Sequence, residues 1–241
     1  MKAVLISDLH TDKKTLGVDR YDDVRQAAHQ SVDLAIREKA DAWAFLGDLC
    51  DPEEGPEVAR GLELMIELES RLRTARIHRI LISGNHDVEE AGQGRTVLSP
   101  LRALVSAEEG GLHIAESPGS FTIGDVAVLL LPYPPVSRPF DLAEYASAMV
   151  KDMLARGVRT GLVLAHATHI PGAVEGEETL EMPRGRAVSL PVDVIPNGWT
   201  VCNGHMHTPQ VTPGGVIIPG AVCRLTRGER ENVPRLVVLE V

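Results

Sequence analysis

The stretch Lys2-Ala3-Val4-Leu5-Ile6-Ser7-Asp8-Leu9-His10 opens the chain with an apolar run and ends in a carboxylate and an imidazole. The apolar run predicts a buried β-strand over residues 2–7, so the two polar side chains fall where the strand ends. In an extended segment, residues two apart share one face, and Asp8 and His10 can therefore reach the same metal ion. The stretch thus predicts a parallel-sheet strand with metal ligands at its tip.

Four further motifs follow along the chain, most of them directly after an apolar run. They are Gly47-Asp48, Gly84-Asn85-His86-Asp87, His166, and Gly204-His205-Met206-His207. The carboxylate of Asp48 can bridge two cations with its two oxygens, and Asn85 offers a neutral carbonyl oxygen. This mixture of nitrogen and oxygen donors suits Mn²⁺, Fe or Zn²⁺ better than Ca²⁺, and the lack of a thiolate argues against a structural zinc site.

Two cations held roughly 3.5–4 Å apart can clamp the attacking and leaving oxygens of an in-line displacement at phosphorus. The motifs therefore predict a binuclear metal site that cleaves phosphate esters. His86 remains after the ligands are assigned, and we expect it beside the scissile phosphate, where it either stabilises the oxyanion or protonates the leaving oxygen. We expect Asp87, its neighbour in sequence, to support the charge of His86.

The periodicity of the rest of the chain predicts an α/β fold. Helical spacing of apolar residues covers 19–39, 57–73 and 142–156, with a short helix at 97–105. Strands are expected at 42–46, 78–82, 120–123, 126–131, 161–165, 200–202, 210–212, 216–218 and 235–241. The β-α-β-α-β opening implies parallel strands with right-handed crossovers, and Gly124-Asp125 and Gly214-Gly215 predict hairpin turns. We expect residues 1–241 to form one domain, with two mixed sheets packed face to face and helices outside.

Composition limits the class of protein further. The net charge of −10 over 241 residues argues against broad attraction to nucleic acid or membrane, although bound divalent cations would reverse the sign locally. The three cysteines form no CxxC pair and fit a reduced, cytoplasmic protein better than a disulfide framework. No apolar run is long enough to span a bilayer, and the first residues do not read as a signal peptide.

At these motifs the sequence resembles the calcineurin-like metallophosphoesterase superfamily, over nearly the whole chain. The resemblance implies a four-layer α/β/β/α sandwich. It also implies two sets of metal ligands that share Asp48 as a bridge. One set is Asp8, His10, Asp48 and His207, and the other is Asp48, Asn85, His166 and His205. His86 matches the catalytic histidine of the family.

Within the superfamily, the chain is most similar to DNA-repair nucleases of the SbcD type. The similarity lies in Gly47-Asp48-Leu49-Cys50-Asp51, in 204–210 (GHMHTPQ), and in Pro219-Gly220-Ala221, Arg224 and Gly228-Glu229. It implies manganese-dependent cleavage of DNA, as an exonuclease or endonuclease, beside an ABC-type ATPase partner. Fe, Zn²⁺ and Mg²⁺ stay open as alternatives to Mn²⁺, and so does a homodimer.

The chain also departs from the pattern of these nucleases. Cys50 stands where an aromatic residue is usual, and Ala221 stands where serine is usual. The sequence stops after its last strand, so we expect the DNA-capping domain and the ATPase-docking helices to be absent. These departures keep open a small-molecule phosphodiesterase or phosphomonoesterase at the same site. A metal-free scaffold that binds a partner protein is a further alternative, but such a scaffold should have lost ligands that are present here.

Several other residues have weaker claims to function. Arg184, Arg186, Arg224 and Arg227 are candidates for phosphate contact, with a solvated surface role as the alternative. The long segment 166–196, which is rich in Gly, Pro, Glu and Arg, suggests function or mobility. We expect that the remaining histidines are not ligands and that the two tryptophans belong to the core. These residues are His29, His78, His113 and His169, and Trp43 and Trp199.

Overall fold

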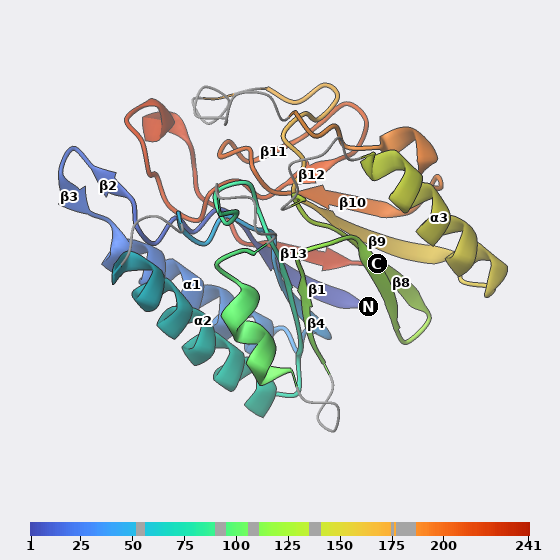
Figure 1. Ribbon diagram of the computed structural model, residues 1–241, viewed down its shortest axis with the longest axis horizontal. Helices are drawn as coiled ribbons and strands as arrows, with labels where there is room; N and C mark the ends of the chain where they lie inside the picture. The colour runs from blue at the N-terminus through green and yellow to red at the C-terminus, as the bar shows by residue number, and fades with distance from the viewer. Residues whose placement is uncertain (52–55, 90–94, 106–110, 135–140, 175, 177–186) are drawn as a thin grey trace.

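Two β-sheets pack face to face in the computed structural model of the chain, with helices on both outer faces (Figure 1). The structure describes residues 1–51, 56–89, 95–105, 111–134, 141–174, 176 and 187–241. The chain ends lie close together, because the amino group of Met1 donates a hydrogen bond to the carbonyl oxygen of Val241 at 2.8 Å. Among the described residues, no helix combines the length and the apolar character needed to cross a membrane.

The first sheet contains the opening strand of the chain. Its strands lie in the order β13 (Val237–Glu240), β1 (Lys2–Ile6), β4 (Ala42–Phe45), β5 (His78–Ile82) and β6 (Leu112–Ala115). The strands β1, β4, β5 and β6 run parallel, and β13 is antiparallel to β1. Helices α1 (Tyr21–Arg37) and α2 (Pro56–Thr74) supply the crossovers and cover the outer face. Both faces of the sheet are therefore buried, which explains the continuous apolar runs in its strands.

The second sheet is built from the later part of the chain. Its order is β11 (Gln210–Val211), β12 (Ile217–Ile218), β10 (Thr200–Asn203), β9 (Thr160–Ala165), β8 (Val126–Leu131) and β7 (Gly119–Ile123). The strands β8, β9 and β10 are parallel, and the expected hairpins join β7 to β8 and β11 to β12. Helix α3 (Leu142–Ala155) packs on the outer face, and the Asp141 carboxylate caps it by accepting from the Ala143 and Glu144 N–H groups.

The two sheets and the helices on their outer faces form four layers, and apolar side chains fill the three interfaces between them. One interface lies between α1, α2 and the first sheet, one between the two sheets, and one between the second sheet and α3. The four-layer α/β/β/α sandwich expected from the sequence is therefore confirmed. Trp43 and Trp199 are both buried, and each indole N–H finds an acceptor, in Ser31 Oγ and in the Arg159 carbonyl oxygen.

The structure differs from the sequence-based expectations in a few elements and boundaries, and strand β6 (Leu112–Ala115) was not among the strands expected. A short hairpin of β2 (Lys14–Thr15) and β3 (Val18–Asp19) was not expected, and helix α1 begins at Tyr21 rather than at residue 19. The reason is local: Asp19 belongs to β3, and its carboxylate accepts the Tyr21 N–H at 2.9 Å. The helix expected over 97–105 is a 3₁₀ helix, η2 (Ser99–Leu104). Among the described residues, two further 3₁₀ turns are η4 (Val192–Val194) and η5 (Gly228–Glu231).

Candidate metal centre

The predicted metal-binding motifs all meet at one edge of the sandwich. They follow β1, β4 and β5 in the first sheet and β9 and β10 in the second, and parallel strands place their carboxyl ends on the same side. Several contacts tie the two sheets together here, two of them to backbone carbonyl oxygens of the first sheet's loops. The Leu46 carbonyl oxygen lies 2.6 Å from Nδ1 of His166, and the Tyr133 N–H donates to the Ser83 carbonyl oxygen.

Positive φ angles mark the turns that follow β1, β4 and β10. Four of the predicted ligands have positive φ angles: Asp8 (55°), His10 (43°), Asp48 (61°) and His205 (71°). Residues other than glycine rarely adopt this backbone conformation, and such strain is concentrated at functional sites. The motif glycines are needed for a different reason, close approach. A Cβ atom on Gly47 would lie 2.5 Å from Nδ1 of His166, so only glycine lets the loops pack this tightly.

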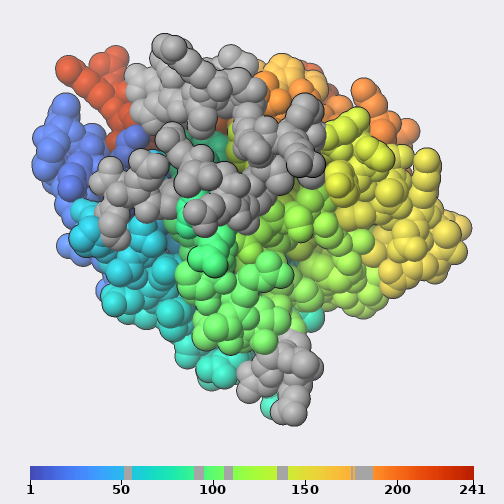
Figure 2. Space-filling model, viewed as in Figure 1, coloured from blue at the N-terminus to red at the C-terminus, as the bar shows by residue number. Residues whose placement is uncertain are grey.

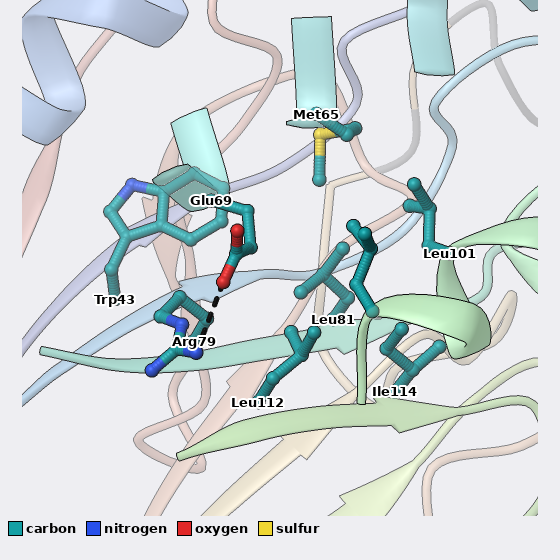
Figure 3. Close-up of a pocket in the computed structure, with 9 residues that line it drawn as sticks. Trp43, Met65, Glu69, Arg79, Leu81, Leu101, Leu112 and Ile114 are labelled. Atoms are coloured by element: carbon teal, nitrogen blue, oxygen red, sulfur yellow. Dashed lines mark hydrogen bonds and ion pairs between the residues drawn. The ribbon is translucent and has the colours of Figure 1, made fainter. Parts of the chain in front are cut away.

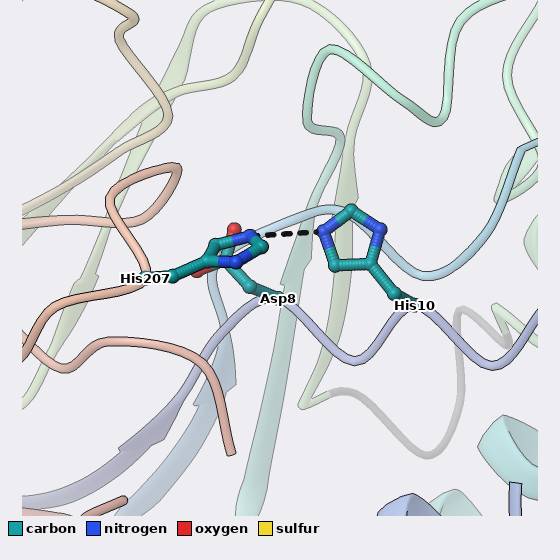
Figure 4. A group of neighbouring side chains, drawn as sticks. All are labelled: Asp8, His10 and His207. Atoms are coloured by element: carbon teal, nitrogen blue, oxygen red, sulfur yellow. Dashed lines mark hydrogen bonds between the residues drawn. The ribbon is translucent and has the colours of Figure 1, made fainter. Parts of the chain in front are cut away.

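Asp8, His10 and His207 form the first cluster of potential ligands (Figure 4). All three side chains are buried, and the Nε2 atoms of His10 and His207 lie 3.2 Å apart. Oδ1 of the Asp8 carboxylate accepts the His205 N–H at 3.1 Å, and this hydrogen bond orients the second oxygen of the carboxylate, Oδ2. The cluster therefore joins the first motif of the chain to the last.

Asp48, His166 and His205 form the second cluster. Oδ2 of Asp48 lies 3.3 Å from Nε2 of His166 and 3.8 Å from Nε2 of His10, so this one carboxylate faces both clusters. Asn85 belongs to the second cluster as well, because its side-chain oxygen lies 3.0 Å from Nε2 of His166 and 2.8 Å from Nδ1 of His205.

Three buried polar atoms in these clusters lack a hydrogen-bond partner within the described part of the chain. They are Asp8 Oδ2, Asp48 Oδ2 and His205 Nε2. Leaving such atoms unsatisfied is costly, and a site built of carboxylates and imidazoles would satisfy them by binding cations. The donor set and the unsatisfied atoms therefore both fit divalent metal ions.

The electrostatics of the site depend on which charges face each group. Burial raises the pKa of Asp8 to about 6. Burial alone would lower the pKa of His166, but the facing carboxylate of Asp48 outweighs it and raises that pKa to about 9. For His205, the charge of Asp48 offsets the effect of burial less, and burial lowers the pKa of His205 to about 3. Closely packed carboxylates and imidazoles thus perturb one another strongly, as is common at functional sites.

Asp87 has a different surrounding from the one expected. Its two carboxylate oxygens accept backbone N–H groups from Asp48 at 2.9 Å, Leu49 at 2.7 Å and Gly84 at 2.7 Å. The side chain therefore ties the loop after β4 to the loop after β5 and fixes the backbone of Asp48. These hydrogen bonds hold Asp87 against the loop that carries Asp48, and the expected support of the His86 charge by Asp87 stays a prediction.

His86 is the most accessible of the predicted site residues. Its backbone N–H donates to Oδ1 of Asp48 at 2.8 Å, and its ring centroid lies 5.0 Å from that of His10. The His86 side chain is half-buried, whereas the predicted ligands are buried. The imidazole is thus placed beside the clusters and within reach of solvent.

Glu229 is a functional candidate for which the sequence predicted no role beyond its place in a Gly-Glu motif. Its Oε1 lies 2.7 Å from Nδ1 of His207, and its Oε2 accepts the Leu225 N–H at 2.6 Å. A carboxylate on the second nitrogen of a metal-binding histidine fixes the ring and raises its basicity. The signal that could have found Glu229 is a buried acidic residue shortly after the last histidine motif.

The residues with weaker claims lie outside the two clusters. His29 is in α1 and His169 is exposed, while His78 and His113 belong to β5 and β6. Arg224 and Arg227 are exposed near the end of the chain. Arg184 and Arg186 lie outside the described residues.

A separate pocket lies under α2 and η2, against the first sheet (Figure 3). Its lining is apolar except for Glu69 and Arg79, which form an ion pair of 3.0 Å. Trp43, Met65 and Leu81 are among the apolar residues around the pair. Because the two charges neutralise each other, this pocket has no group left for metal or phosphate chemistry.

Residues 1–209 match the model of the calcineurin-like phosphoesterase family, and the chain belongs to that family. Among curated proteins it is similar to the DNA double-strand break repair protein Mre11 of Sulfurisphaera tokodaii, with 27% identity over 222 residues, or 88% of this chain and 51% of the relative. The protein of the same name from Aeropyrum pernix is 25% identical and matches 97% of this chain and 56% of its own length. The chain thus spans about half the length of these relatives.

Solved structures show the same fold. A dimetal phosphatase from Danio rerio superposes with a TM-score of 0.57 at 13% identity, covering 92% of this chain and 87% of that one. The purple acid phosphatase PPD1 of yellow lupin (Lupinus luteus) gives a TM-score of 0.55 at 14% identity, covering 87% of this chain and 39% of that one. At these identities the likeness concerns the fold.

Proposed function

We propose that the protein is a binuclear-metal phosphodiesterase that hydrolyses DNA, with Mn²⁺ as its cofactor. The observation that carries the proposal is the position of Asp48, whose unsatisfied oxygen faces both histidine clusters at 3.3 and 3.8 Å. One carboxylate between two clusters of buried imidazoles is the arrangement that a pair of bridged cations requires. The family to which the chain belongs supports the same reading.

The proposed ligands follow the two clusters. Asp8, His10, Asp48 and His207 would hold one ion, and Asp48, Asn85, His166 and His205 would hold the other. When bound, such ions supply Lewis acidity toward a phosphoryl oxygen and lower the pKa of water. Asp87 keeps the Asp48 backbone in place, and Glu229 keeps the His207 ring in place.

His86 is the proposed catalytic residue of the protein itself. Its half-exposed ring stands beside His10, where it can contact a phosphate that approaches from solvent. There the imidazole either donates a hydrogen bond to the phosphoryl oxygen on which charge develops or gives its proton to the leaving oxygen. Both roles place a proton on a ring nitrogen of His86 in the transition state.

DNA is the proposed substrate because of the Mre11 relatives. Their names describe double-strand break repair, and their similarity covers most of this chain. An ABC-type ATPase partner and a homodimer belong to the same proposal. We place the protein in the cytoplasm, in agreement with its free cysteines, Cys50, Cys202 and Cys223. The net charge of −10 favours the competing proposal, a small-molecule phosphodiesterase at the same site.

Hydrolysis of three substrates separates these proposals. Linear duplex DNA, single-stranded DNA and bis-p-nitrophenyl phosphate are incubated with the protein in Mn²⁺ and in EDTA. We expect metal-dependent cleavage of all three. Cleavage of the small diester with both DNAs intact would replace DNA by a small-molecule substrate, and no cleavage of any of the three would contradict the phosphodiesterase itself.

The variant His86→Ala tests the catalytic assignment, with His113→Ala as the matched control. Loss of a single transition-state contact of this kind lowers turnover by about 10²–10³-fold. We expect that loss in His86→Ala with Mn²⁺ binding retained, and unchanged turnover in His113→Ala. Unchanged turnover in His86→Ala would remove the residue from the mechanism.

A further inference from the structure

The tip of the β2–β3 hairpin carries a leucine that neither the turn nor the core explains. Thr15 pairs with Val18, so Leu16 and Gly17 form a two-residue turn, with φ angles of 53° and 80°. Two positive φ angles are typical of a type I′ turn, in which Asn, Asp and Gly are the favoured residues. A leucine is strained in this conformation, and yet 84% of Leu16 is exposed. The side chain therefore stabilises nothing that the structure shows.

The base of the hairpin, in contrast, is held firmly. The Arg60 guanidinium donates to both carboxylate oxygens of Asp19, at 2.6 and 3.2 Å, and to the Thr11 carbonyl oxygen at 2.7 Å. On the other strand, the Thr15 hydroxyl donates to the Leu225 carbonyl oxygen at 2.6 Å. The strained apolar tip is thus presented on an anchored support.

The hairpin is joined directly to the metal centre. Only three residues, Thr11 to Lys13, separate the proposed ligand His10 from β2. The six-residue step from His10 to Leu16 therefore spans at most about 20 Å. On its other side, Leu225 donates its N–H to Glu229, which contacts the proposed ligand His207. The hairpin (blue) and the segment that carries η5 (red) project side by side in Figure 1, and both reach the outline of the molecule in Figure 2.

Two exposed arginines, Arg224 and Arg227, lie in the segment next to the hairpin, although the protein as a whole is acidic. Lys14 and Arg20 flank the hairpin but are paired with the carboxylates of Glu57 at 3.5 Å and Asp23 at 2.8 Å. Arg20 also donates to the Arg224 carbonyl oxygen at 3.0 Å, which holds the segment with Arg224 beside the hairpin. Arg224 and Arg227 are exposed, and no ion pair of either is found among the described residues. Cations of this kind are suited to contact DNA phosphates.

We propose that Leu16 is a wedge that enters the end of a DNA duplex and unstacks its terminal base pairs beside the metal centre. The inference rests on the proposed DNA hydrolysis and goes beyond it, because it names the paired duplex end as the substrate that this hairpin recognises. Apolar side chains act as wedges between base steps in other DNA-binding proteins. The upper limit of about 20 Å between His10 and Leu16 corresponds to at most about six base pairs, within one turn of B-form DNA. The cations and the link to His207 favour DNA over a protein partner at this tip.

Three variants test the wedge, and each is chosen so that the fold survives. Leu16→Asn removes the apolar side chain and suits a left-handed turn position better than leucine does. Leu16→Met keeps an apolar side chain. Ile66→Gln removes an exposed apolar residue from the surface of α2, where Ile66 is 45% exposed, and serves as the matched control. Each protein is assayed in Mn²⁺ on blunt duplex DNA, single-stranded DNA and bis-p-nitrophenyl phosphate.

We expect Leu16→Asn to lose about tenfold or more of its duplex cleavage, since unstacking base steps is what the wedge supplies. Cleavage of single-stranded DNA and of the small diester should stay unchanged, and Leu16→Met and Ile66→Gln should behave like the wild type on all substrates. As a second readout, fluorescence of 2-aminopurine at the penultimate base pair should rise when His86→Ala protein binds the duplex. The rise should be lost in the double variant that carries both His86→Ala and Leu16→Asn.

Three results would overturn the wedge. The first is unchanged duplex cleavage in Leu16→Asn, which would leave the tip for a protein partner. The second is an equal loss on duplex and single-stranded DNA, which would make Leu16 a general binding residue. The third is a wild type that cleaves the small diester and neither DNA. This third result is also the failure of the proposed DNA hydrolysis, whereas the first two leave DNA hydrolysis intact and overturn the wedge alone.

Discussion

Strand β5 has histidines near both of its ends, and the two ends differ in what surrounds them. At its carboxyl end, the loop with Asn85 and His86 enters a centre where imidazoles face the carboxylate of Asp48. At its amino end, His78 stacks at 5.8 Å on His113 of β6, and His113 stacks at 3.6 Å on Phe121. One group of histidines is therefore built around an anion, and the other is built around an aromatic ring.

The pKa values show the consequence of this difference. At the metal centre, Asp48 raises the pKa of His166 to about 9 against the effect of burial. At the amino end, burial and the neighbouring His78 lower the pKa of His113 to about 4. The two groups of histidines thus differ in whether a carboxylate faces them, because Asp48 raises the pKa of His166 although burial still lowers the pKa of His205 to about 3.

Removal of metal should have the largest effect. It should affect the histidines around Asp48, at the carboxyl end of β5, and not those at its amino end. Cations that bind the folded state at a thousand times their Kd stabilise it by about 4 kcal/mol. For a chain of this size, EDTA should therefore lower the Tm by on the order of 10 °C and abolish hydrolysis. Differential scanning calorimetry of the wild type and of His113→Ala checks this. A Tm that does not depend on EDTA would contradict a metal centre.

The substitution Asp48→Asn should have the next largest effect, because it removes the charge that both clusters share. We expect turnover of bis-p-nitrophenyl phosphate to fall by about 100-fold or more. The number of Mn²⁺ ions bound after dialysis should fall as well. Asp125→Asn, in the turn between β7 and β8, is the matched control and should behave like the wild type. If Asp48→Asn kept full metal content and turnover, the bridge would be wrong.

The substitution Glu229→Gln should have an intermediate effect. It leaves the ligands intact but weakens the hold on the His207 ring, and such changes cost about 10–100-fold in metal affinity. We expect Mn²⁺ titrations to show weaker binding, with turnover restored at high Mn²⁺. A loss that excess Mn²⁺ does not restore would point to a role other than positioning His207.

The smallest effect should come from His113→Phe at the amino end of β5. The pKa of His113 is about 4 in the folded protein and 6.5 ordinarily, so the unfolded chain takes up the proton more readily between these values. Stability from this group is therefore present at pH 7 and lost as the pH falls toward 5. The variant should show a smaller drop in Tm between pH 7 and pH 5 than the wild type. An equal drop in both proteins would contradict the inference.

The sequence predicted the fold at the level of layers because its strands are buried on both faces and its helices are amphipathic. The runs around Leu5, Ala44 and Ile80 could belong only to a covered parallel sheet. It failed where structure depends on a single local contact. The β2–β3 hairpin has too few residues for a periodic pattern, and the start of α1 depends on the Asp19 carboxylate.

The predicted ligands come together in the structure because each motif ends a strand whose place in the sheet could be inferred. The surroundings of Asp87 and Glu229 could not be inferred. Asp87 contacts backbone N–H groups 37–39 residues away in the chain, and Glu229 contacts a histidine 22 residues away. Contacts of this kind depend on how loops fold over one another, which no periodicity records.

The amount of Mn²⁺ bound per chain tests the central claim most directly. Protein freed of metal with EDTA is dialysed against Mn²⁺, and the bound metal is measured together with its electron paramagnetic resonance spectrum. Two ions per chain with the spectrum of a magnetically coupled pair would agree with two clusters joined by Asp48. One ion per chain, or two ions that show no coupling, would contradict a binuclear centre.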